Sequence, residues 1–407
     1  MRILLSTYGS RGDVEPLVEL AAQLRESGAQ VRVCAPPDEE FAQLLARVGL
    51  PVVPVGRPMR TMARPSSAAE AGRRVAELAA QFDAVLAAAQ GCDAILATGL
   101  AHFSSRSAAE KLGIPYVYAT FCSFLLPTPH HAPPAALLPA AGQEPAPEGA
   151  DNRTLWELNA QLFDTLHGEA LNAHRASVGL PPVSGVRDFI LTDRPWLASD
   201  PLLDPWQETP ELGVVHTGAW LLPDERPLPA DLLAFLDAGA PPVWVGLGST
   251  RHASAEIARV AVEAVRAQGR RVLLGRGWAE LVPVDDRDDC FAVGEVNQQR
   301  LFRRVAAVVH HGGAGTTTTA ARAGAPQVVV PQGADQPYWA RRVADLGVGA
   351  AVDGPLPTVE ALSAALATAL SPQVQARAVT VAGAVRTDGA AVAAERLLEA
   401  VSRGAAG

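Results

Sequence analysis

Residues 306–323 read AAVVHHGGAGTTTTAARA. An apolar run, expected as a strand, leads into two histidines, a glycine-rich turn at 312–315 and a threonine run that opens an expected helix over 316–323. A glycine-rich turn before a helix lets backbone N–H groups approach a phosphate closely, and the helix dipole adds partial positive charge. The stretch therefore predicts an anion-binding strand-turn-helix unit of an α/β fold. A turn needed only for tight packing is the less favoured alternative, because two histidines and the threonines accompany it.

The same alternation of strand and helix extends over the whole chain. In the helix expected at 14–27, apolar residues recur at the spacing of one helical face, and Gly28 ends the pattern. Strands separated by helices of this length pair in parallel through right-handed crossovers. Two doubly wound α/β halves are predicted, with strands at 2–7, 31–35, 93–98, 116–121, 243–247, 271–274, 291–293, 306–310 and 327–330.

Prolines mark the boundary between the halves. A proline-rich stretch at 218–242, with a short expected helix at 231–237, is typical of an interdomain linker. Two further irregular stretches, 57–67 and 127–152, are expected as surface loops that either cover a ligand or have no role. The predicted domains are 1–217 (N-terminal), 218–242 (linker), 243–388 (C-terminal) and 389–407 (a closing helix expected to pack back on the N-terminal domain).

The composition excludes several classes of protein. The chain has 407 residues, 48% apolar and 19% charged, which is enough for packed cores and rules out a disordered or fibrous protein. Its formal charge is −9, and no basic stripe suggests binding to nucleic acid. The four cysteines lie far apart without zinc-ligand spacing, which favours reduced thiols and a cytoplasmic location. We expect neither a secretion signal nor a membrane-spanning helix.

A second candidate site element is the sequence PQGADQP at 331–337. It again follows an expected strand and precedes an expected helix, so Asp335 and Gln336 should lie at the edge of the sheet where the glycine-rich turn lies. A carboxylate and an amide together can bond to the vicinal hydroxyls of a sugar. The alternative is that Asp335 is an ordinary N-cap, with Pro337 in the first turn of the helix.

In the first half, residues 9–16 (GSRGDVEP) follow the first expected strand. Asp13 is expected as the N-cap of the helix, and one of its oxygens can cap while the other accepts a proton. We regard Arg11-Gly12-Asp13 as a chance match to an adhesion tripeptide.

Two other patterns are weaker. Residues 285–289 (DDRDD) contain an Asp-x-Asp, which holds a divalent cation in some sugar transferases, but an acidic run of this kind is normally a solvated turn. Residues 246–249 (GLGS) begin like a dinucleotide fingerprint, but Arg251 stands where the third glycine should be. This disfavours a nicotinamide oxidoreductase.

Taken together, five motifs resemble those of the GT-B nucleotide-sugar glycosyltransferases of family 1. They are residues 9–16, 277–278 (GW), 294–298 (GEVNQ), 310–317 (HHGGAGTT) and 334–337 (ADQP). The stretches 171–183 and 218–228 are similar, in particular, to the bacterial antibiotic glycosyltransferases that decorate vancomycin-type glycopeptides. The likeness covers essentially the whole chain. It implies an α/β fold of the GT-B class, with two doubly wound Rossmann-like domains facing each other across a cleft.

The resemblance also implies residue roles. Asp13 would be the general base of an inverting transferase that needs no metal ion and no cofactor besides the nucleotide-sugar co-substrate. The donor would be bound by Ser10, Ser249, Trp278, Val296, Gln298, His310, Gly312, Gly313, Thr316, Thr317, Asp335 and Gln336. Of these, His310, the glycines and the N–H groups near the threonines would hold the diphosphate. Val296 and Gln298 would lie along the base and ribose, and Asp335 and Gln336 would contact the hexose.

The acceptor implied by the resemblance is a glycopeptide antibiotic aglycone. It would meet the N-terminal domain at Phe121, Phe124, His130 and His131, near the 127–152 loop. The donor would carry a hexose of the glucose or N-acetylglucosamine type on UDP. Alternatives are a macrolide, polyketide or other small-molecule acceptor, a dTDP-deoxysugar donor, and a non-catalytic nucleotide-sugar-binding auxiliary protein. The presence of Asp13 disfavours the last of these.

Overall fold

The chain forms two compact units. The computed structural model describes residues 1–61, 77, 81–99, 102–134, 147, 149–249 and 255–404. Unit 1 comprises Met1–Ser199, Trp206–Leu222 and Thr387–Gly407, whereas unit 2 comprises Asp200–Pro205 and Pro223–Arg386.

Unit 1 is built on a parallel sheet of seven strands in the order β3-β2-β1-β4-β5-β6-β7. The strand order reverses between β1 and β4, so the topological switch point lies at the carboxyl ends of these two strands. The strands are β1 (Arg2–Thr7), β2 (Gln30–Ala35), β3 (Val52–Pro54), β4 (Ala94–Thr98), β5 (Tyr116–Thr120), β6 (Trp196–Leu197) and β7 (Val215–His216).

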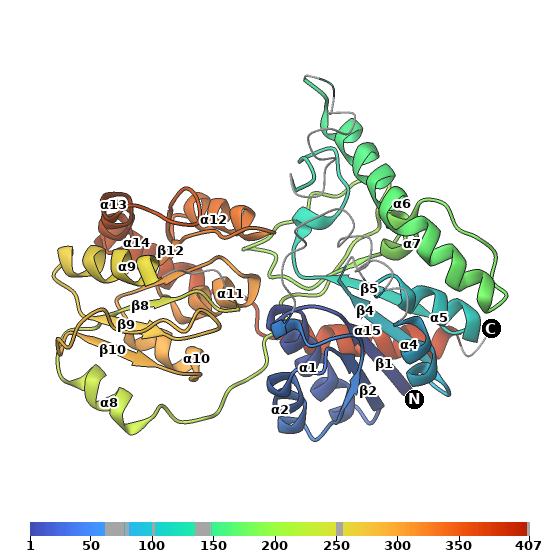
Figure 1. Ribbon diagram of the computed structural model, residues 1–407, viewed down its shortest axis with the longest axis horizontal. Coiled ribbons are helices and arrows are strands. Elements are labelled where there is room, and N and C mark those ends of the chain that lie inside the picture. Colours follow the sequence, from blue (N-terminus) through green and yellow to red (C-terminus); the bar gives the residue numbers. More distant parts are fainter. Residues whose placement is uncertain are drawn as a thin grey trace. The chain divides into compact units, whose positions relative to one another are not determined.

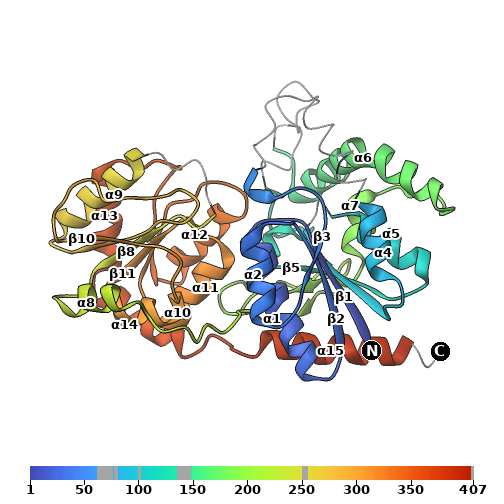
Figure 2. The ribbon, with the colours of Figure 1, turned by 60° about the horizontal axis from the view of Figure 1, so that its bottom comes forward.

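Helices cover both faces of this sheet because its strands are apolar on both sides. Leu4 packs with Val85 and Ala108 of α4 and α5, while α1 contacts α2 and α15 (Figure 2). A further core cluster joins Tyr118 of β5 to helices α6 and α7. The helices are α1 (Arg11–Glu26), α2 (Glu39–Arg47), α4 (Phe82–Ala89), α5 (Ser104–Leu112), α6 (Asn152–Ser177), α7 (Val186–Leu191) and α15 (Gly389–Gly404), with 3-10 turns η1 (Met59–Thr61) and η2 (Ser123–Leu125).

Unit 2 is built on a parallel sheet of six strands in the order β10-β9-β8-β11-β12-β13. Its order reverses between β8 and β11, where His310 is in register with Gly246. The carboxyl ends of these two strands are therefore the expected ligand position of this unit. The strands are β8 (Val243–Gly246), β9 (Val272–Gly275), β10 (Cys290–Val293), β11 (Ala307–His310), β12 (Gln327–Val329) and β13 (Gly349–Ala351).

Successive residues of β8 serve opposite faces of this sheet, as the two-residue period of a strand requires. Val243 and Val245 pack in the core under α9 and α13, whereas Trp244 packs with residues of α8, α10 and α11 (Figure 1). The helices are α8 (Ala230–Asp237), α9 (Ala255–Ala267), α10 (Gln298–Leu301), η4 (Phe302–Arg304), α11 (Ala314–Ala323), α12 (Gln336–Asp345), α13 (Val359–Ala369) and α14 (Pro372–Ala382).

The two doubly wound parallel-sheet units confirm the predicted fold class. The sequence did not indicate β3, β6, β7 or β13, which have only two or three residues and show no periodicity. It also did not indicate that Asp200–Pro205 belongs with unit 2. Of the two expected loops, residues 62–67, 135–146 and 148 lie outside the described residues.

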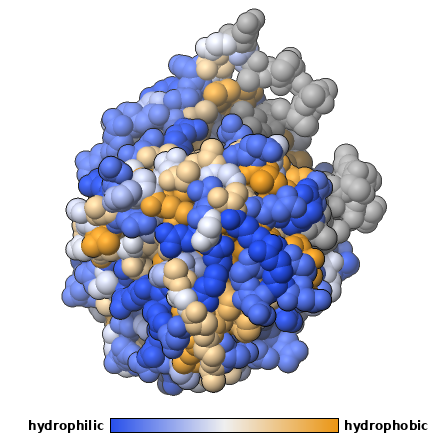
Figure 3. Space-filling model, turned by 90° about the vertical axis from the view of Figure 1, so that its left-hand side faces the viewer, coloured by the Kyte–Doolittle hydropathy of each residue, from blue (hydrophilic) through white to orange (hydrophobic). Residues whose placement is uncertain are grey.

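The described part of the chain contains no helix long and apolar enough to cross a bilayer. All four cysteines are free thiols. On the face drawn in Figure 3, hydrophilic and apolar groups are interspersed among the described residues, and no single apolar band crosses it.

Candidate functional site

The glycine-rich turn connects β11 to α11. Gly313 precedes the first turn of α11 and offers no side chain to cap it. Within the described helix, the N–H groups of residues 314–316 therefore have no carbonyl acceptor and point out of its N-terminus. Together with the helix dipole they form an anion-binding site. The N–H of Thr317 is not among these donors, because both it and the Thr317 hydroxyl donate to the Gly313 carbonyl at 2.9 Å.

Gly312 is required by both conformation and space. Its φ of +90° lies in the region that residues with a Cβ rarely adopt. A Cβ there would also lie 2.7 Å from Cγ1 of Val329 and 3.1 Å from the carbonyl oxygen of Gln336. The turn therefore packs against the end of β12 and the start of α12.

His310, the last residue of β11, is fully buried. Its Nε2 lies 2.9 Å from Oε1 of Gln327, and its Nδ1 accepts a hydrogen bond of 3.1 Å from the N–H of Gly312. Burial lowers the pKa of this imidazole to about 3, so the ring is neutral at physiological pH. Direct contact with a phosphate, as expected from the sequence, would require His310 to give up one of these bonds. The geometry instead makes the ring a support of the turn.

Of the two adjacent histidines, His311 is the one with an unpartnered ring nitrogen. Its Nδ1 is buried and has no hydrogen-bond partner among the described residues. A Cβ on Gly248 would lie 2.6 Å from its Cε1, and a Cβ on Gly313 would lie 2.6 Å from its Nε2. Burial lowers its pKa to about 4. A neutral imidazole is thus held between the glycines of two turns.

The sequence analysis assigned the ligand contact to His310 and did not single out His311, whose ring nitrogen lacks a partner among the described residues. A signal was present, because an apolar strand that ends in His310 places this residue inside the sheet. The next residue is then the first one outside it.

Two more turns meet at this edge. The carbonyl of Gly248, after β8, accepts a hydrogen bond of 3.0 Å from the N–H of Trp278. A Cβ on Gly277 would lie 2.6 Å from the same carbonyl oxygen. Ser249 and Trp278 are both partly exposed. The structure therefore places these two predicted donor-binding residues on turns that adjoin the His311 ring.

The nucleoside-binding residues expected at 294–298 lie between β10 and α10. The Val296 side chain is buried in the core with Phe302, so it leaves only its backbone for a base or ribose. Gln298 is partly exposed at the first position of α10. Asn297 caps this helix, with its side-chain oxygen accepting from the N–H of Arg300 at 2.9 Å.

Asp335 and Gln336 are tied to the start of α12. Asp335 occupies the N-cap position, but its side chain does not cap the helix. Its Oδ2 instead accepts a hydrogen bond of 2.9 Å from the indole N–H of Trp339. Burial raises the pKa of Asp335, and the bond to Trp339 opposes that change. The Gln336 Oε1 accepts from the N–H groups of Gln332 and Gly333, at 2.7 Å and 3.2 Å. The alternative is confirmed in position, because Asp335 is the N-cap and Pro337 lies in the first turn, but the Asp335 side chain bonds to Trp339 and not to the helix N-terminus.

In unit 1, Asp13 lies in the first turn of α1, just after β1. Ser10 is the N-cap, and Asp13 is the third helical residue, so the expectation that Asp13 is the N-cap is wrong. The Oδ2 of Asp13 accepts a hydrogen bond of 2.8 Å from the N–H of Ser10, the reciprocal bond of a capping box. This bond fixes the carboxylate over the turn that leaves the sheet.

Asp13 lies at the switch point of unit 1. There the hydroxyl of Thr98, at the end of β4, donates to that of Thr7 at 2.8 Å. The pKa of Tyr118, on the next strand, is raised chiefly by burial, and the Asp13 charge adds to this increase. The Asp13 carboxylate therefore acts electrostatically on the carboxyl end of the sheet.

The chain resembles known glycosyltransferases over almost its whole length. The family model "Glycosyltransferase family 28 N-terminal domain" matches residues 3–127, and "Erythromycin biosynthesis protein CIII-like, C-terminal domain" matches residues 287–397. Glycosyltransferase GtfE of Amycolatopsis orientalis is 59% identical over 98% of this chain and 98% of its own. Vancomycin aglycone glucosyltransferase and dTDP-epi-vancosaminyltransferase of the same organism are 57% and 53% identical, each over 99% of this chain and 98% of its own.

The chain belongs to the GT-B glycosyltransferases of family 1. The crystal structure of the glycotransferase of kitacinnamycin has the same fold, with a TM-score of 0.74 at 20% identity over 98% of both chains. Glycosyltransferase VinC in complex with dTDP gives a TM-score of 0.65 at 21% identity over 99% of this chain and 100% of its own.

The acceptor-binding residues predicted for this glycosyltransferase do not all lie in one cluster. Phe124 and His131 lie 5.6 Å apart between ring centroids, and His131 lies 5.9 Å from Trp156 of α6. Phe121 instead contacts Trp220 edge to face at 5.9 Å. His130 is exposed. The structure thus joins Phe124 and His131 in one aromatic cluster, and Trp156 is a member that the sequence analysis missed.

A cavity of about 430 Å³ adjoins this cluster. Trp156 and residues 127–129 contribute apolar surface, and Arg187 contributes charge. Its volume falls within the range of small-molecule sites, which is roughly 300–1,000 Å³.

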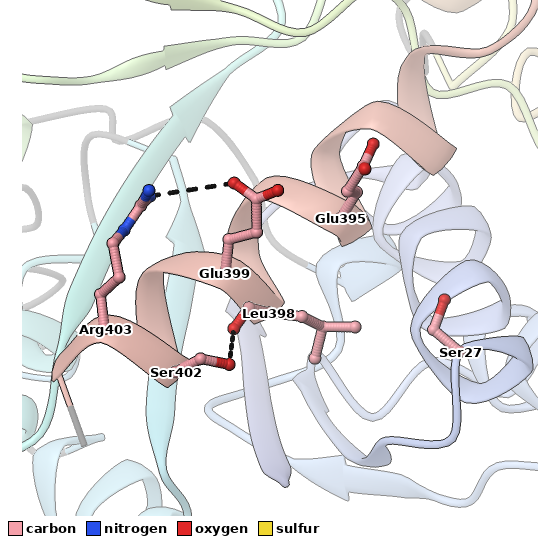
Figure 4. A pocket seen from close by; sticks show the side chains of 6 residues that line it. All are labelled: Ser27, Glu395, Leu398, Glu399, Ser402 and Arg403. Carbon is pink, nitrogen blue, oxygen red and sulfur yellow. Dashed lines mark hydrogen bonds and ion pairs between the residues drawn. The ribbon is translucent and has the colours of Figure 1, made fainter. Parts of the chain in front are cut away.

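A second depression, of about 690 Å³, lies between the end of α1 and α15 (Figure 4). It is lined by Ser27, Glu395, Leu398, Glu399, Ser402 and Arg403. Because α1 begins at the carboxyl edge of the sheet and runs back along it, Ser27 lies at the end of the helix opposite to Asp13. This depression therefore has no part in the site at the switch point.

The Asp-x-Asp pattern of this glycosyltransferase, Asp286-Arg287-Asp288, is flanked by two aspartates that form salt bridges. Arg266 contacts Asp285 at 2.7 Å and Asp289 at 2.6 Å. Hydrogen bonds from Arg266 lower the pKa of Asp285 to about 2. Among the residues that the structure describes, no three His, Cys, Asp or Glu side chains gather in a metal-binding arrangement.

Proposed function

We propose that this glycosyltransferase moves a hexose, with inversion, from a nucleoside diphosphate sugar to a hydroxyl of a glycopeptide aglycone. The observation that carries the proposal is the chemistry at the two switch points. Unit 1 holds a carboxylate there, through the bond between Ser10 and Asp13. Unit 2 holds an anion-binding helix N-terminus beside His311. Transfer of a sugar from a diphosphate requires two things of the protein: a base that accepts the proton of the acceptor hydroxyl, and groups that stabilise the charge on the leaving diphosphate.

The proposed reaction is a single displacement. Asp13 accepts the proton of the acceptor hydroxyl as its oxygen bonds to the anomeric carbon. The bond between this carbon and the diphosphate oxygen breaks on the opposite face, and the diphosphate leaves with the electron pair. Because attack and departure occur on opposite faces, the anomeric configuration inverts and no covalent enzyme intermediate forms.

The donor contacts follow from the geometry of unit 2. The N–H groups of residues 314–316 and the open Nδ1 of His311 would receive the diphosphate. Asp335, held by Trp339, and the amide of Gln336 would bond to hexose hydroxyls. Trp278, Gln298 and the backbone of Val296 would lie along the nucleoside, with Ser10 and Ser249 close to the phosphates.

We propose that the transfer needs no metal ion. The charge that develops on the leaving diphosphate would be balanced by the α11 dipole and by hydrogen bonds from this turn. Asp285 and Asp289, which Arg266 engages, flank the Asp-x-Asp pattern, whose own carboxylates, Asp286 and Asp288, are exposed in a surface turn. We also propose a cytoplasmic location, which the four free thiols support.

The relatives bear on donor and acceptor. A glucosyltransferase of the vancomycin aglycone at 57% identity supports a hexose donor and a glycopeptide acceptor. We propose that this acceptor binds near Phe121, Phe124, His130 and His131. The dTDP-epi-vancosaminyltransferase at 53% keeps a dTDP-deoxysugar donor as the alternative. A macrolide, polyketide or other small-molecule acceptor is the second alternative.

One experiment tests all of these choices. The protein is incubated with UDP-glucose, UDP-N-acetylglucosamine or a dTDP-deoxysugar, and with a glycopeptide aglycone or a macrolide lactone. We expect a mass increase of one hexose on the glycopeptide only, an inverted anomeric centre by NMR, and an unchanged rate with a chelator present. A product on the macrolide only, or a chelator-sensitive rate, would contradict the corresponding part of the proposal. Asp13→Asn serves as the inactive control.

A further inference from the structure

Two polar side chains are completely buried beneath the glycine-rich turn. His310, at the end of β11, and Gln327, at the start of β12, both have an exposed fraction of 0%. Burying polar groups costs free energy unless each of them is hydrogen-bonded. Apolar side chains at these two positions would avoid this cost, so the presence of a polar pair calls for an explanation.

The backbone determines how this pair is protonated. The N–H of Gly312 can only donate, and it lies 3.1 Å from Nδ1 of His310. Nδ1 must therefore be the unprotonated nitrogen, which puts the ring proton of the neutral imidazole on Nε2. Nε2 then donates to Oε1 of Gln327 at 2.9 Å and fixes the orientation of that amide. Gly312 thus donates to His310, and His310 donates to Gln327.

This orientation of the Gln327 amide leaves one of its polar groups without a hydrogen bond. With Oε1 facing His310, the buried Nε2 of Gln327 has no hydrogen-bond partner in the described part of the chain. An unsatisfied buried donor is destabilising. If the amide turned over, its N–H group would face Nε2 of His310 and force the ring proton onto Nδ1, against the N–H of Gly312. The observed arrangement is the one that preserves the bond to the turn.

We propose that Gln327 is a positioning residue for the diphosphate of the donor. By accepting from Nε2, it gives the buried Nε2–H of His310 a partner and holds the ring where its Nδ1 anchors Gly312. The anchored turn then keeps the conformation in which His311 and the N–H groups of residues 314–316 face the ligand. This inference rests on the proposed donor site, and it concerns a side chain that does not touch the ligand.

Two substitutions separate positioning from simple packing. Gln327→Leu removes the acceptor, frees the tautomer of His310, and should weaken diphosphate binding roughly tenfold at every pH. Gln327→Glu places a carboxylate against Nε2, which favours a doubly protonated His310. The added proton on Nδ1 then opposes the N–H of Gly312, so binding should weaken further as the pH falls.

The measurement is calorimetric titration of uridine diphosphate into the purified protein between pH 6 and pH 8. Each dissociation constant is divided by the wild-type value at the same pH, which cancels the titration of the ligand itself. Val328→Ala is the matched control, because Val328 is equally buried on the same strand but belongs to the core formed with α9 and α13. Its ratio should stay near one. The ratio for Gln327→Glu should rise as the pH falls. The rise for one coupled proton is at most about tenfold per pH unit.

Nitrogen NMR of the histidine rings gives a second readout that does not depend on binding. We expect the Nε2–H tautomer for His310 in the wild type throughout this pH range and a mixture of tautomers in Gln327→Leu. Wild-type binding with a flat, near-unity ratio for Gln327→Glu, or an Nδ1–H tautomer in the wild type, would overturn the positioning role alone. If the wild type binds neither uridine nor thymidine diphosphate, the proposed donor site fails and the inference falls with it.

Discussion

The Oδ2 atom of Asp13 lies 2.1 Å from the position that a Cβ on Gly9 would occupy. The carboxylate therefore fills the space that the missing side chain leaves, and the N–H of Ser10 holds it there at 2.8 Å. Since Gly9 has an ordinary backbone conformation, space rather than φ is what requires glycine at this position.

We expect Gly9→Ala to displace the Asp13 carboxylate and to lower kcat roughly a hundredfold, a loss that a misplacement of about 1 Å can cause. Affinity for the nucleoside diphosphate should change little, because the turn proposed to hold the diphosphate, at residues 312–316, lies in unit 2. Steady-state kinetics and calorimetry test this pair of outcomes. Gly12→Ala is the matched control, since a Cβ there meets its nearest atom, Oγ of Ser10, only at 3.8 Å. A comparable loss of kcat in both variants would contradict the explanation.

Asp13→Asn should lower kcat by about 10²–10⁴-fold, the usual contribution of a general base. The amide oxygen of asparagine can still accept from the N–H of Ser10, so the capping box and the melting temperature should be largely preserved. Product formation is followed by mass spectrometry and unfolding by circular dichroism. A rate within tenfold of the wild type would mean that another group accepts the proton.

Gly312→Ala should abolish measurable donor binding. The substitution combines a φ of +90° with a Cβ placed 2.7 Å from Val329, so the turn must change its conformation. Calorimetric titration of uridine diphosphate measures the effect. Gly383→Ala serves as the control in the same unit, because φ there is −69° and the nearest atom lies at 3.6 Å. Equal loss of binding in both variants would count against a specific role for the turn.

Trp339→Phe should shift the acid limb of the pH-rate profile to higher pH. Burial raises the pKa of Asp335, and the indole N–H of Trp339 partly opposes this by stabilising the carboxylate. Removing the N–H raises the pKa further, so Asp335 becomes protonated at a higher pH and loses its acceptor character towards the sugar. The profile of kcat/KM for the donor sugar tests this. An unchanged acid limb would remove Asp335 from the proposed sugar contacts.

Stability should fall as the pH decreases from about 6.5 to 4. Burial lowers the pKa of His102 to about 4 from an ordinary value of 6.5, so in this window the unfolded chain binds a proton that the folded chain does not. His102→Gln can keep a bond to Ser6 and should reduce the slope of the unfolding free energy by up to about 1.4 kcal/mol per pH unit. Chemical denaturation at several pH values measures it. The same substitution at exposed His130 is the control, and equal slopes in the wild type and His102→Gln would contradict the assignment.

The sequence predicted the fold because its strands of four or more residues are continuous apolar runs between helical periods. β1, β4 and β8 illustrate this, since each is buried on both faces. The two-residue strands β6 and β7 carry no such pattern. Nothing in the sequence indicates that Asp200–Pro205 associates with unit 2. There Asp200 accepts a hydrogen bond of 2.7 Å from the N–H of Arg386, a contact between residues far apart in the sequence that no local pattern predicts.

The predicted site residues illustrate a second limit. Spacing identified the loops of Asp13, His310 and Asp335, but it could not assign the side-chain bonds. Aspartate is a common N-cap residue, and only the structure shows that Asp13 is the third residue of α1 rather than its N-cap. Asp335 bonds to Trp339 one helical turn later, which an N-cap rule does not anticipate.

Helix α15 packs against α1 and buries Ala393, Ala394 and Leu397. In the sequence it follows the whole of residues 223–386, which form unit 2. At translation rates of about 5–20 residues per second, synthesis of these residues takes roughly ten to thirty seconds. Unit 1 lacks α15 during that time. During that interval the α1 surface that α15 later covers is exposed, which makes the nascent chain a natural client for a chaperone.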